Sequence, residues 1–446
     1  MTDLRPAAST LQLAAGFDRA LIRRGGDSVR FLVVDVTAPT VEAEKTPAVS
    51  KAPLNLALVI DASGSMQGTP IAAAKEAARR VAASLGAADR LSVVSFDSDI
   101  TVHLEGRPQD AAGQAAAAAA IAALEAGSST DLGGGWLRGC ACVARVMEEH
   151  PGLRNRVVVL SDGQANRGIV EPDELATHAS QLRARGLLSS AVGIGESYSD
   201  AQLEAIAASG GGRLHHAAAA AEIVELVLGE LEELRETVVE SCDLVLETPP
   251  GFAAELVGDY AATHDAGRWS CVVGSLASGA LRRVVWKIHC PAGKLGESAE
   301  LSIGASWRRV GAADAVAAAP VRCELRFATG EQCLAQPRDR ERALIVAGTW
   351  QFSIVRAATR LNQDGELRRA GELVKRELRH FVRYAEGLPE AKGMVAALER
   401  LAASIGAARY APMAAKEMRV ASTKGLRGER ELRAHAQLAW DTHLPK

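Results

Sequence analysis

The sequence predicts an α/β protein in which a doubly wound, mostly parallel sheet is inserted in a β-sandwich and followed by a helical unit. Three patterns lead to this fold class. Continuous apolar strands alternate with amphipathic helices over residues 51–236, which is typical of a parallel sheet covered on both faces. Short strands without intervening helices fill residues 237–335. A helical period returns from residue 336 onward.

The insertion is inferred from the order of the segments. Residues 1–50 contain one clear strand, "SVRFLVVDVTA", followed by a connector rich in proline and alanine. Because this strand precedes the α/β unit and the other short strands follow it, we expect residues 1–50 and 237–335 to form one sandwich. The chain of 446 residues is long enough for several domains.

The α/β unit begins with the apolar strand "LNLALVI" and a helix that has Pro70 in its first turn and Gly86 at its end. The strands "RLSVVSFDS", "NRVVVLSDG" and "LLSSAVGIG" follow, separated by helical segments. Within residues 336–446 we expect three helices. Residues 406–446 are polar, basic and weakly periodic, so the sequence predicts an extended or partner-dependent tail there.

Composition excludes several classes of protein. The net charge is −3 and the basic residues are spread along the whole chain, so no nucleic-acid surface is expected. The N-terminus has no pattern of a secretory signal, and no apolar run is long enough to predict a membrane span. The seven cysteines are irregularly spaced, which favours reduced thiols and a cytoplasmic location.

Oxygen-bearing side chains follow two predicted strands of the α/β unit or precede a helix beside them. Ligands of open parallel sheets bind at the carboxyl ends of the strands, so these residues are expected to meet there. Hydroxyl and carboxylate oxygens suit Mg²⁺, which keeps octahedral oxygen coordination and several waters. The candidate metal ligands are Asp61, Ser63, Ser65, Thr130 and Asp162.

In "LALVIDASGSM", "GSSTDLGGG" and "VVVLSDGQAN", the five residues and their setting resemble the metal-ion-dependent adhesion site of von Willebrand factor A domains. The resemblance covers residues 53–232. It implies that Ser63 and Ser65 bind Mg²⁺ through their hydroxyls and that Asp61 and Asp162 act mainly through ordered waters. Thr130 would bind the metal directly in the ligand-bound arrangement.

The resemblance also implies a function. The domain would be a non-enzymatic protein-binding module in which an acidic side chain of a partner completes the coordination of Mg²⁺, with Mn²⁺ or Ca²⁺ as alternative ions. The arrangement of segments is similar to that of the bacterial cytosolic members of the family, which often work beside AAA+ ATPases or in multiprotein assemblies.

Three other interpretations stay open at this stage. Asp61 and the two serines could simply cap the helix that starts near Pro70. The chain could be a scaffold with an idle site. It could also be a phosphoryl-transfer enzyme of the haloacid-dehalogenase-like type, although such an enzyme needs a second carboxylate where Ser63 stands and a lysine at the site. No lysine lies between Lys75 and Lys287, so we expect no catalysis.

Overall fold

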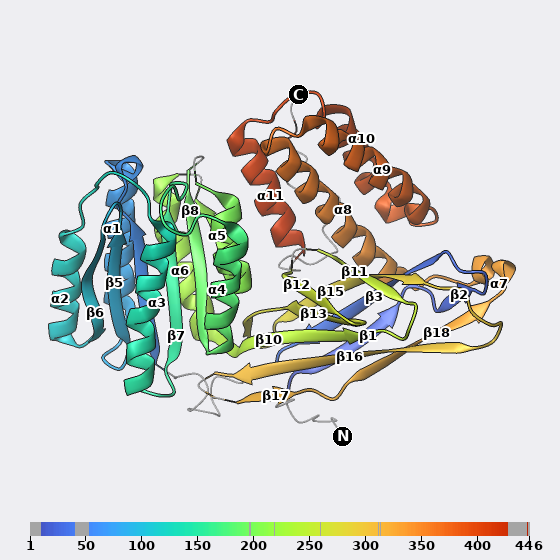
Figure 1. Ribbon diagram of the computed structural model, residues 1–446, viewed down its shortest axis with the longest axis horizontal. Helices are drawn as coiled ribbons and strands as arrows, with labels where there is room; N and C mark the ends of the chain where they lie inside the picture. Colours follow the sequence, from blue (N-terminus) through green and yellow to red (C-terminus); the bar gives the residue numbers. More distant parts are fainter. Residues whose placement is uncertain are drawn as a thin grey trace, which may run out of the picture.

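The computed structural model describes residues 10–40, 53–195, 198–217, 219–258, 260–310, 312, 314–426 and 444. Figure 1 shows an α/β unit at one end, a two-sheet sandwich at the other, and a group of helices standing on the sandwich beside the α/β unit. The predicted fold class is confirmed. The exact domain boundaries remain a prediction.

The α/β unit is built on a six-stranded sheet with the order β6-β5-β4-β7-β8-β9. All neighbours are parallel except β6, which runs antiparallel to β5. The carboxyl ends of β4, β5, β7 and β8 therefore share one edge of the sheet. The strands are β4 (Leu54–Asp61), β5 (Arg90–Phe96), β6 (Ile100–Pro108), β7 (Arg154–Ser161), β8 (Leu187–Ile194) and β9 (Gly211–Ala217).

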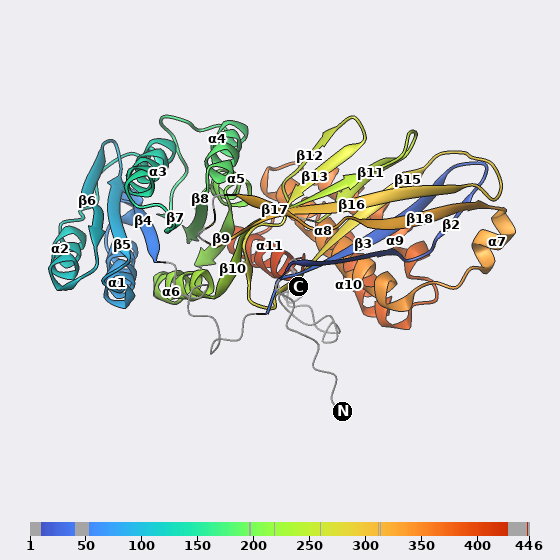
Figure 2. The same ribbon diagram turned by 90° about the horizontal axis from the view of Figure 1, so that it is seen from below.

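Both faces of this sheet are covered by helices, which explains why its central strands are apolar throughout. In β4, Leu56 and Leu58 face one helical layer, whereas Ala57 and Val59 face the other. Figure 2 shows the two layers on opposite sides of the sheet. The first layer contains α1 (Thr69–Ser84), α2 (Ala111–Ala122) and α6 (Ala220–Glu236), and the second contains α3 (Leu132–Glu149), α4 (Pro172–Ala184) and α5 (Asp200–Ser209).

The sandwich consists of a four-stranded and an eight-stranded sheet. The first has the order β1 (Gln12–Phe17), β3 (Ser28–Thr37), β15 (Leu281–Cys290) and β11 (Ala253–Val257). The second follows the path β12 (Ala262–Asp265), β13 (Arg268–Val272), β10 (Thr237–Glu247), β16 (Ser298–Arg309), β18 (Val321–Ala328) and β2 (Leu21–Arg23). Two short strands, β14 (Leu276–Ala277) and β17 (Ala315–Ala317), pair with β10 and β16.

Strand β3 joins the N-terminal segment to the rest of the sandwich. It lies between β1 and β15 and pairs with both of them antiparallel. Its side chains are buried alternately in two cores. Leu32 and Val34 face the second sheet, whereas Phe31 and Val33 pack against helices. The chain leaves the sandwich after β3 and returns through β10, directly after α6, so the α/β unit is an insertion.

The C-terminal helices differ from the prediction at one point. The three expected helices are present, but Pro412–Leu426 form a further helix, α11, where an extended tail was predicted. Ala415 and Met418 of α11 are fully buried in the core that α8 forms with its neighbours. The elements here are α7 (Gly330–Ala335), α8 (Arg340–Gln363), α9 (Leu367–Ala385), the 3-10 turn η2 (Pro389–Ala391), α10 (Lys392–Ser404) and α11.

The sequence also failed to predict β6. This strand lies at the edge of the sheet and is only half buried, so polar residues such as His103 and Glu105 interrupt its apolar pattern. Within the described ranges, no helix has both the length and the apolar character needed to cross a membrane. All seven cysteines are free and buried.

Candidate metal centre

The site begins where β4 ends. All residues of this strand are buried, and its last residue, Asp61, has no exposed surface. The chain then turns through the 3-10 helix η1 (Gly64–Met66) before α1 starts at Thr69. Gly68 precedes α1, and no side chain caps this helix. Asp61, Ser63 and Ser65 therefore do not serve as its N-cap, which removes the simplest alternative to a ligand role.

Both carboxylate oxygens of Asp61 are held in place. The Ser63 amide donates to Asp61 Oδ1 at 2.8 Å, and the Ser161 hydroxyl donates to Asp61 Oδ2 at 2.5 Å. Ser161 is the last residue of β7, the neighbouring strand, so this bond joins two strand ends. The orientation of the Asp61 carboxylate is thus fixed by the backbone of its own turn and by the adjacent strand.

The two serines connect Asp61 to Asp162. Ser63 Oγ lies 3.1 Å from Ser65 Oγ, and Ser65 donates to Asp162 Oδ1 at 2.7 Å. Ser63 is buried, whereas Ser65 is exposed. The loop after β4 and the loop after β7 are therefore joined by a row of oxygen atoms, one end of which is open to solvent.

Thr130 approaches from the loop before α3. Its amide donates to Asn166 Oδ1, and its carbonyl accepts from the Asn166 amide, both at 3.2 Å. A β-carbon placed on Gly163 would lie 3.2 Å from Thr130 Oγ1 and 3.5 Å from Asp61 Oδ2. Because glycine has no such carbon, Thr130 and Asp61 both come close to the start of the loop that carries Asp162.

The electrostatics of the site favour a cation. Burial raises the pKa of Asp61, as does the charge of Asp162, although hydrogen bonds from Ser161 and Ser63 oppose the shift. Burial likewise raises the pKa of Asp162. Among the described residues, no basic side chain contributes to either shift. Two buried carboxylates thus lie close together, and none of the residues that the structure describes supplies a neutralising charge.

The donor set fits a hard divalent cation. It offers carboxylate and hydroxyl oxygens from three loops, with no nitrogen or sulfur among them, which suits Mg²⁺. No group of three or more His, Cys, Asp or Glu side chains converges within the described ranges. The oxygen donors at this edge are the carboxylates of Asp61 and Asp162 and the hydroxyls of Ser63, Ser65 and Thr130.

Sequence reasoning missed two supporting residues. Ser161 fixes Asp61, and Asn166 fixes the backbone of Thr130. Both lie in "VVVLSDGQAN", beside a predicted ligand, but neither was recognised because each acts on a residue of another loop. Strand pairing between β4 and β7 would have pointed to Ser161 had the register been known.

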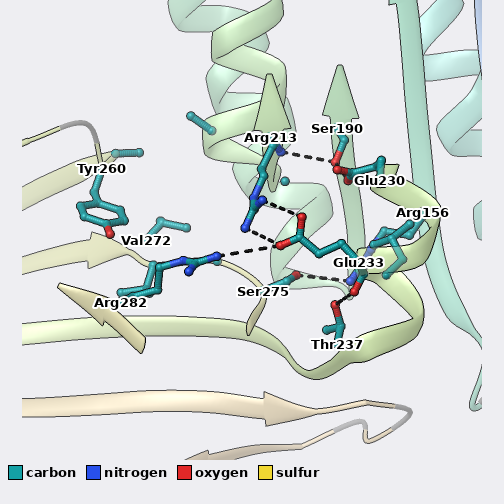
Figure 3. Close-up of a pocket in the computed structure, with 17 residues that line it drawn as sticks. Arg156, Ser190, Arg213, Glu230, Glu233, Thr237, Tyr260, Val272, Ser275 and Arg282 are labelled. Atoms are coloured by element: carbon teal, nitrogen blue, oxygen red, sulfur yellow. Dashed lines mark hydrogen bonds and ion pairs between the residues drawn. The ribbon is translucent and has the colours of Figure 1, made fainter. Parts of the chain in front are cut away.

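A second polar region lies where the α/β unit meets the sandwich (Figure 3). It surrounds a cavity of about 50 Å³, which has room for a few water molecules but not for an organic ligand. Arg213 Nη1 donates to Glu233 Oε2 at 2.6 Å, and Arg282 Nη2 lies 3.9 Å from Glu233 Oε1. Arg156 donates to Ser275 Oγ at 3.3 Å. We call this region the junction.

Residues 55–228 match the family model described as the von Willebrand factor type A domain. An uncharacterized protein from Synechocystis sp. is 30% identical over 226 residues, which cover 49% of this chain and 52% of that protein. The chain therefore spans about half the length of this curated relative.

Two solved structures share most of the fold. A von Willebrand factor type A protein from Catenulispora acidiphila aligns with a TM-score of 0.65 and 18% identity, covering 88% of this chain and 89% of that one. An ArnB paralog from Sulfolobus acidocaldarius aligns with a TM-score of 0.58 and 17% identity, covering 94% and 98%. At these identities the likeness concerns the arrangement of the units and leaves their functions open.

Proposed function

Because residues 55–228 form a von Willebrand factor type A domain, we propose that this protein is a metal-dependent protein-binding module. Asp61, Ser63, Ser65, Thr130 and Asp162 would hold Mg²⁺, and an acidic side chain of a partner would complete its coordination. One observation carries the proposal: two buried carboxylates and three hydroxyls converge at one edge of the sheet without a basic side chain of the described residues to neutralise them.

The proposed ligands explain why a partner would be needed. Three of the five are neutral hydroxyls, so a divalent ion held by them keeps part of its positive charge. Ser65 is exposed and opens the site to solvent, which leaves room for a further oxygen. A carboxylate is the group that such an ion prefers there. Recognition would thus require an Asp or Glu side chain on the partner.

Metal binding is tested by titrating Mg²⁺ into the metal-free protein and following heat release and thermal unfolding. Saturable binding with a rise in Tm is expected for the parent. Asp61→Ala should lose the response, while Asp265→Ala, on exposed β12, should keep it. An equal response of parent and Asp61→Ala would rule out this site.

Partner binding is tested by comparing proteins captured from the native host with Mg²⁺ and with EDTA. Thr130→Ala should lose the Mg²⁺-dependent captures, because it removes one hydroxyl from the site. Thr177→Ala is a matched control, since its hydroxyl bonds only within α4. A partner retained equally in EDTA would place recognition on the sandwich or the helices instead.

A further inference from the structure

Helix α11 contacts the α/β unit although it lies near the other end of the chain. One face, with Ala415 and Met418, is buried in the core of the helical unit. On another face, Lys416 contacts residues that lie between β8 and α5, and Arg419 contacts the first residue of α5. Figure 1 shows α11 between the other C-terminal helices and α5. The helix thus joins two units by an apolar contact on one side and a charged contact on the other.

Lys416 is bound at the end of β8. Its side chain is buried, and Nζ donates to the carbonyl oxygens of Gly195 and Tyr198 at 3.3 and 3.5 Å. The same Nζ lies 3.5 Å from the centre of the Tyr198 ring, a cation–π contact that gains strength away from water. Since β8 is parallel to β7, this contact lies at the same edge of the sheet as the candidate metal site, one strand beyond Asp162.

Three ion pairs hold α5 itself, one of them a long contact of 4.0 Å between Arg419 and Glu204. Arg419 Nη1 lies 2.6 Å from Asp200 Oδ2 in the first turn of α5, and Arg356 of α8 pairs with Glu204 one turn later. The side chains of Arg419 and Asp200 are 14% and 18% exposed, so solvent screens this pair only in part. The N-terminal half of α5 is therefore fixed by the C-terminal helices.

Helix α5 in turn fixes the loop that carries Asp162, which we call the metal-site loop (residues 162–171). The Ser199 amide donates to the Gly163 carbonyl at 3.4 Å. The buried Gln202 side chain accepts from the Ala165 amide at 3.0 Å and donates to the Val170 carbonyl at 2.8 Å. Hydrogen bonds thus run from α5 to both ends of this loop.

We infer that α11 is a latch for the candidate metal site and that Lys416 and Arg419 are positioning residues. When α11 is docked, it fixes α5, and α5 fixes the metal-site loop with Asp162 facing Ser65. When α11 is released, the loop loses that support and the oxygen atoms of the site are no longer held together. The inference rests on the proposed function for the identity of the ligand, but the coupling between α11 and the loop can be measured without any metal.

The test uses the full-length chain with Lys416→Met, Arg419→Gln and the control Arg368→Gln. Arg368 is exposed on α9 and pairs with Glu372 of the same helix. Each latch variant should bind Mg²⁺ about five- to tenfold more weakly by calorimetry, the lower part of the range for coupled sites. Amide hydrogen exchange over residues 163–170 should become faster in both latch variants and stay unchanged in the control. Arg419→Lys should restore both properties, because it keeps the charge facing Asp200.

Coupling is reciprocal, so Mg²⁺ should also slow amide exchange in α11 of the parent. Unchanged exchange in the metal-site loop of both latch variants would overturn the inference, as would unchanged Mg²⁺ affinity. If the parent fails to bind Mg²⁺ but the latch variants still loosen the loop, the proposed function fails and the latch stands. If the parent binds Mg²⁺ and neither latch variant alters affinity or exchange, the latch fails and the proposed function stands.

Discussion

The junction and the candidate metal site both bury carboxylates, but the surrounding residues shift the pKa of these carboxylates in opposite directions. Glu230 lines the junction cavity. Burial alone would raise its pKa, yet the hydrogen bond and charge of His215, the Ser190 hydroxyl and the charge of Arg213 together lower it to about 2. At the strand ends, burial raises the pKa of Asp61, and hydrogen bonds from Ser161 and Ser63 only oppose the shift.

This difference distinguishes a buried charge that stabilises the fold from one that is suited to bind an ion. A buried ion pair whose partners come from the protein is complete, and breaking it is costly because the other charge is left behind. Buried carboxylates without a protein cation are instead suited to an ion from solution. At the junction the protein itself supplies the partners of the buried carboxylate, whereas at the strand ends we propose that an ion from solution does so.

The largest expected effect comes from separating the units. The junction contains residues of both the α/β unit and the sandwich, whereas the candidate metal site lies wholly within the α/β unit. A fragment of residues 51–236 should fold and bind Mg²⁺, more weakly than the full chain because it lacks α11. A fragment of residues 237–335 should fail to fold, because it lacks β3 beside β15. Circular dichroism with thermal unfolding checks both, and a cooperatively folding second fragment would contradict the shared sandwich.

The next largest effect is a loss of stability in Glu230→Gln. The change removes a carboxylate whose pKa is lowered from 4.5 to about 2, so it should reduce the free energy of unfolding at pH 7 by about 3 kcal/mol. Because the pKa is lower in the folded state, this stabilisation is present above pH 4.5 and is lost as the pH falls toward 2. The parent and the variant should thus converge at low pH.

Urea unfolding at several pH values measures this difference. Glu232→Gln, an exposed change on the same helix, is the matched control and should follow the parent throughout. Mg²⁺ affinity should be unaltered in Glu230→Gln. A constant gap between parent and variant from pH 7 to 2 would show that the loss arises from packing and not from the ionised carboxylate.

Much of the α/β unit could be predicted because its signals are local. Apolar runs predict the strands β4, β7 and β8. The polar residues that follow these runs predict the edge where ligands meet. Parallel pairing then brings Asp61 and Asp162 together without knowledge of the rest of the fold. Asp61, Ser63, Ser65 and Asp162 were predicted as ligands from these strand ends and Thr130 from the start of a helix, and their role in metal binding remains a prediction.

The two elements that were missed have weak patterns of their own, for different reasons. Helix α11 looked like a polar tail because it carries basic residues, two of which, Lys416 and Arg419, face the Tyr198 ring and Asp200. Strand β6 looked irregular because an edge strand has one neighbour and an open side. For α11, the residue types make sense only when the opposing surface is known, and a single sequence does not reveal that surface.

The smallest expected effect is a gain in the free energy of unfolding, whereas Glu230→Gln should lower it. It tests most directly whether the junction and the candidate metal site differ. Asp61→Asn removes a buried charge that the protein does not neutralise, yet its side-chain oxygen still accepts from the Ser63 amide. The metal-free variant should therefore be somewhat more stable than the parent at pH 7. Because the pKa of Asp61 is raised in the folded state, the difference in stability between variant and parent should shrink as the pH falls through that pKa.

Mg²⁺ should make the parent the more stable of the two: at 100 times its Kd it stabilises the parent by about 2.7 kcal/mol and leaves the variant unchanged. Urea unfolding with and without Mg²⁺ measures both differences, with Asp265→Asn as the exposed control. A metal-free Asp61→Asn protein that loses as much stability as Glu230→Gln would mean that Asp61 is held by the fold in the same way as Glu230, and the distinction between the two regions would disappear.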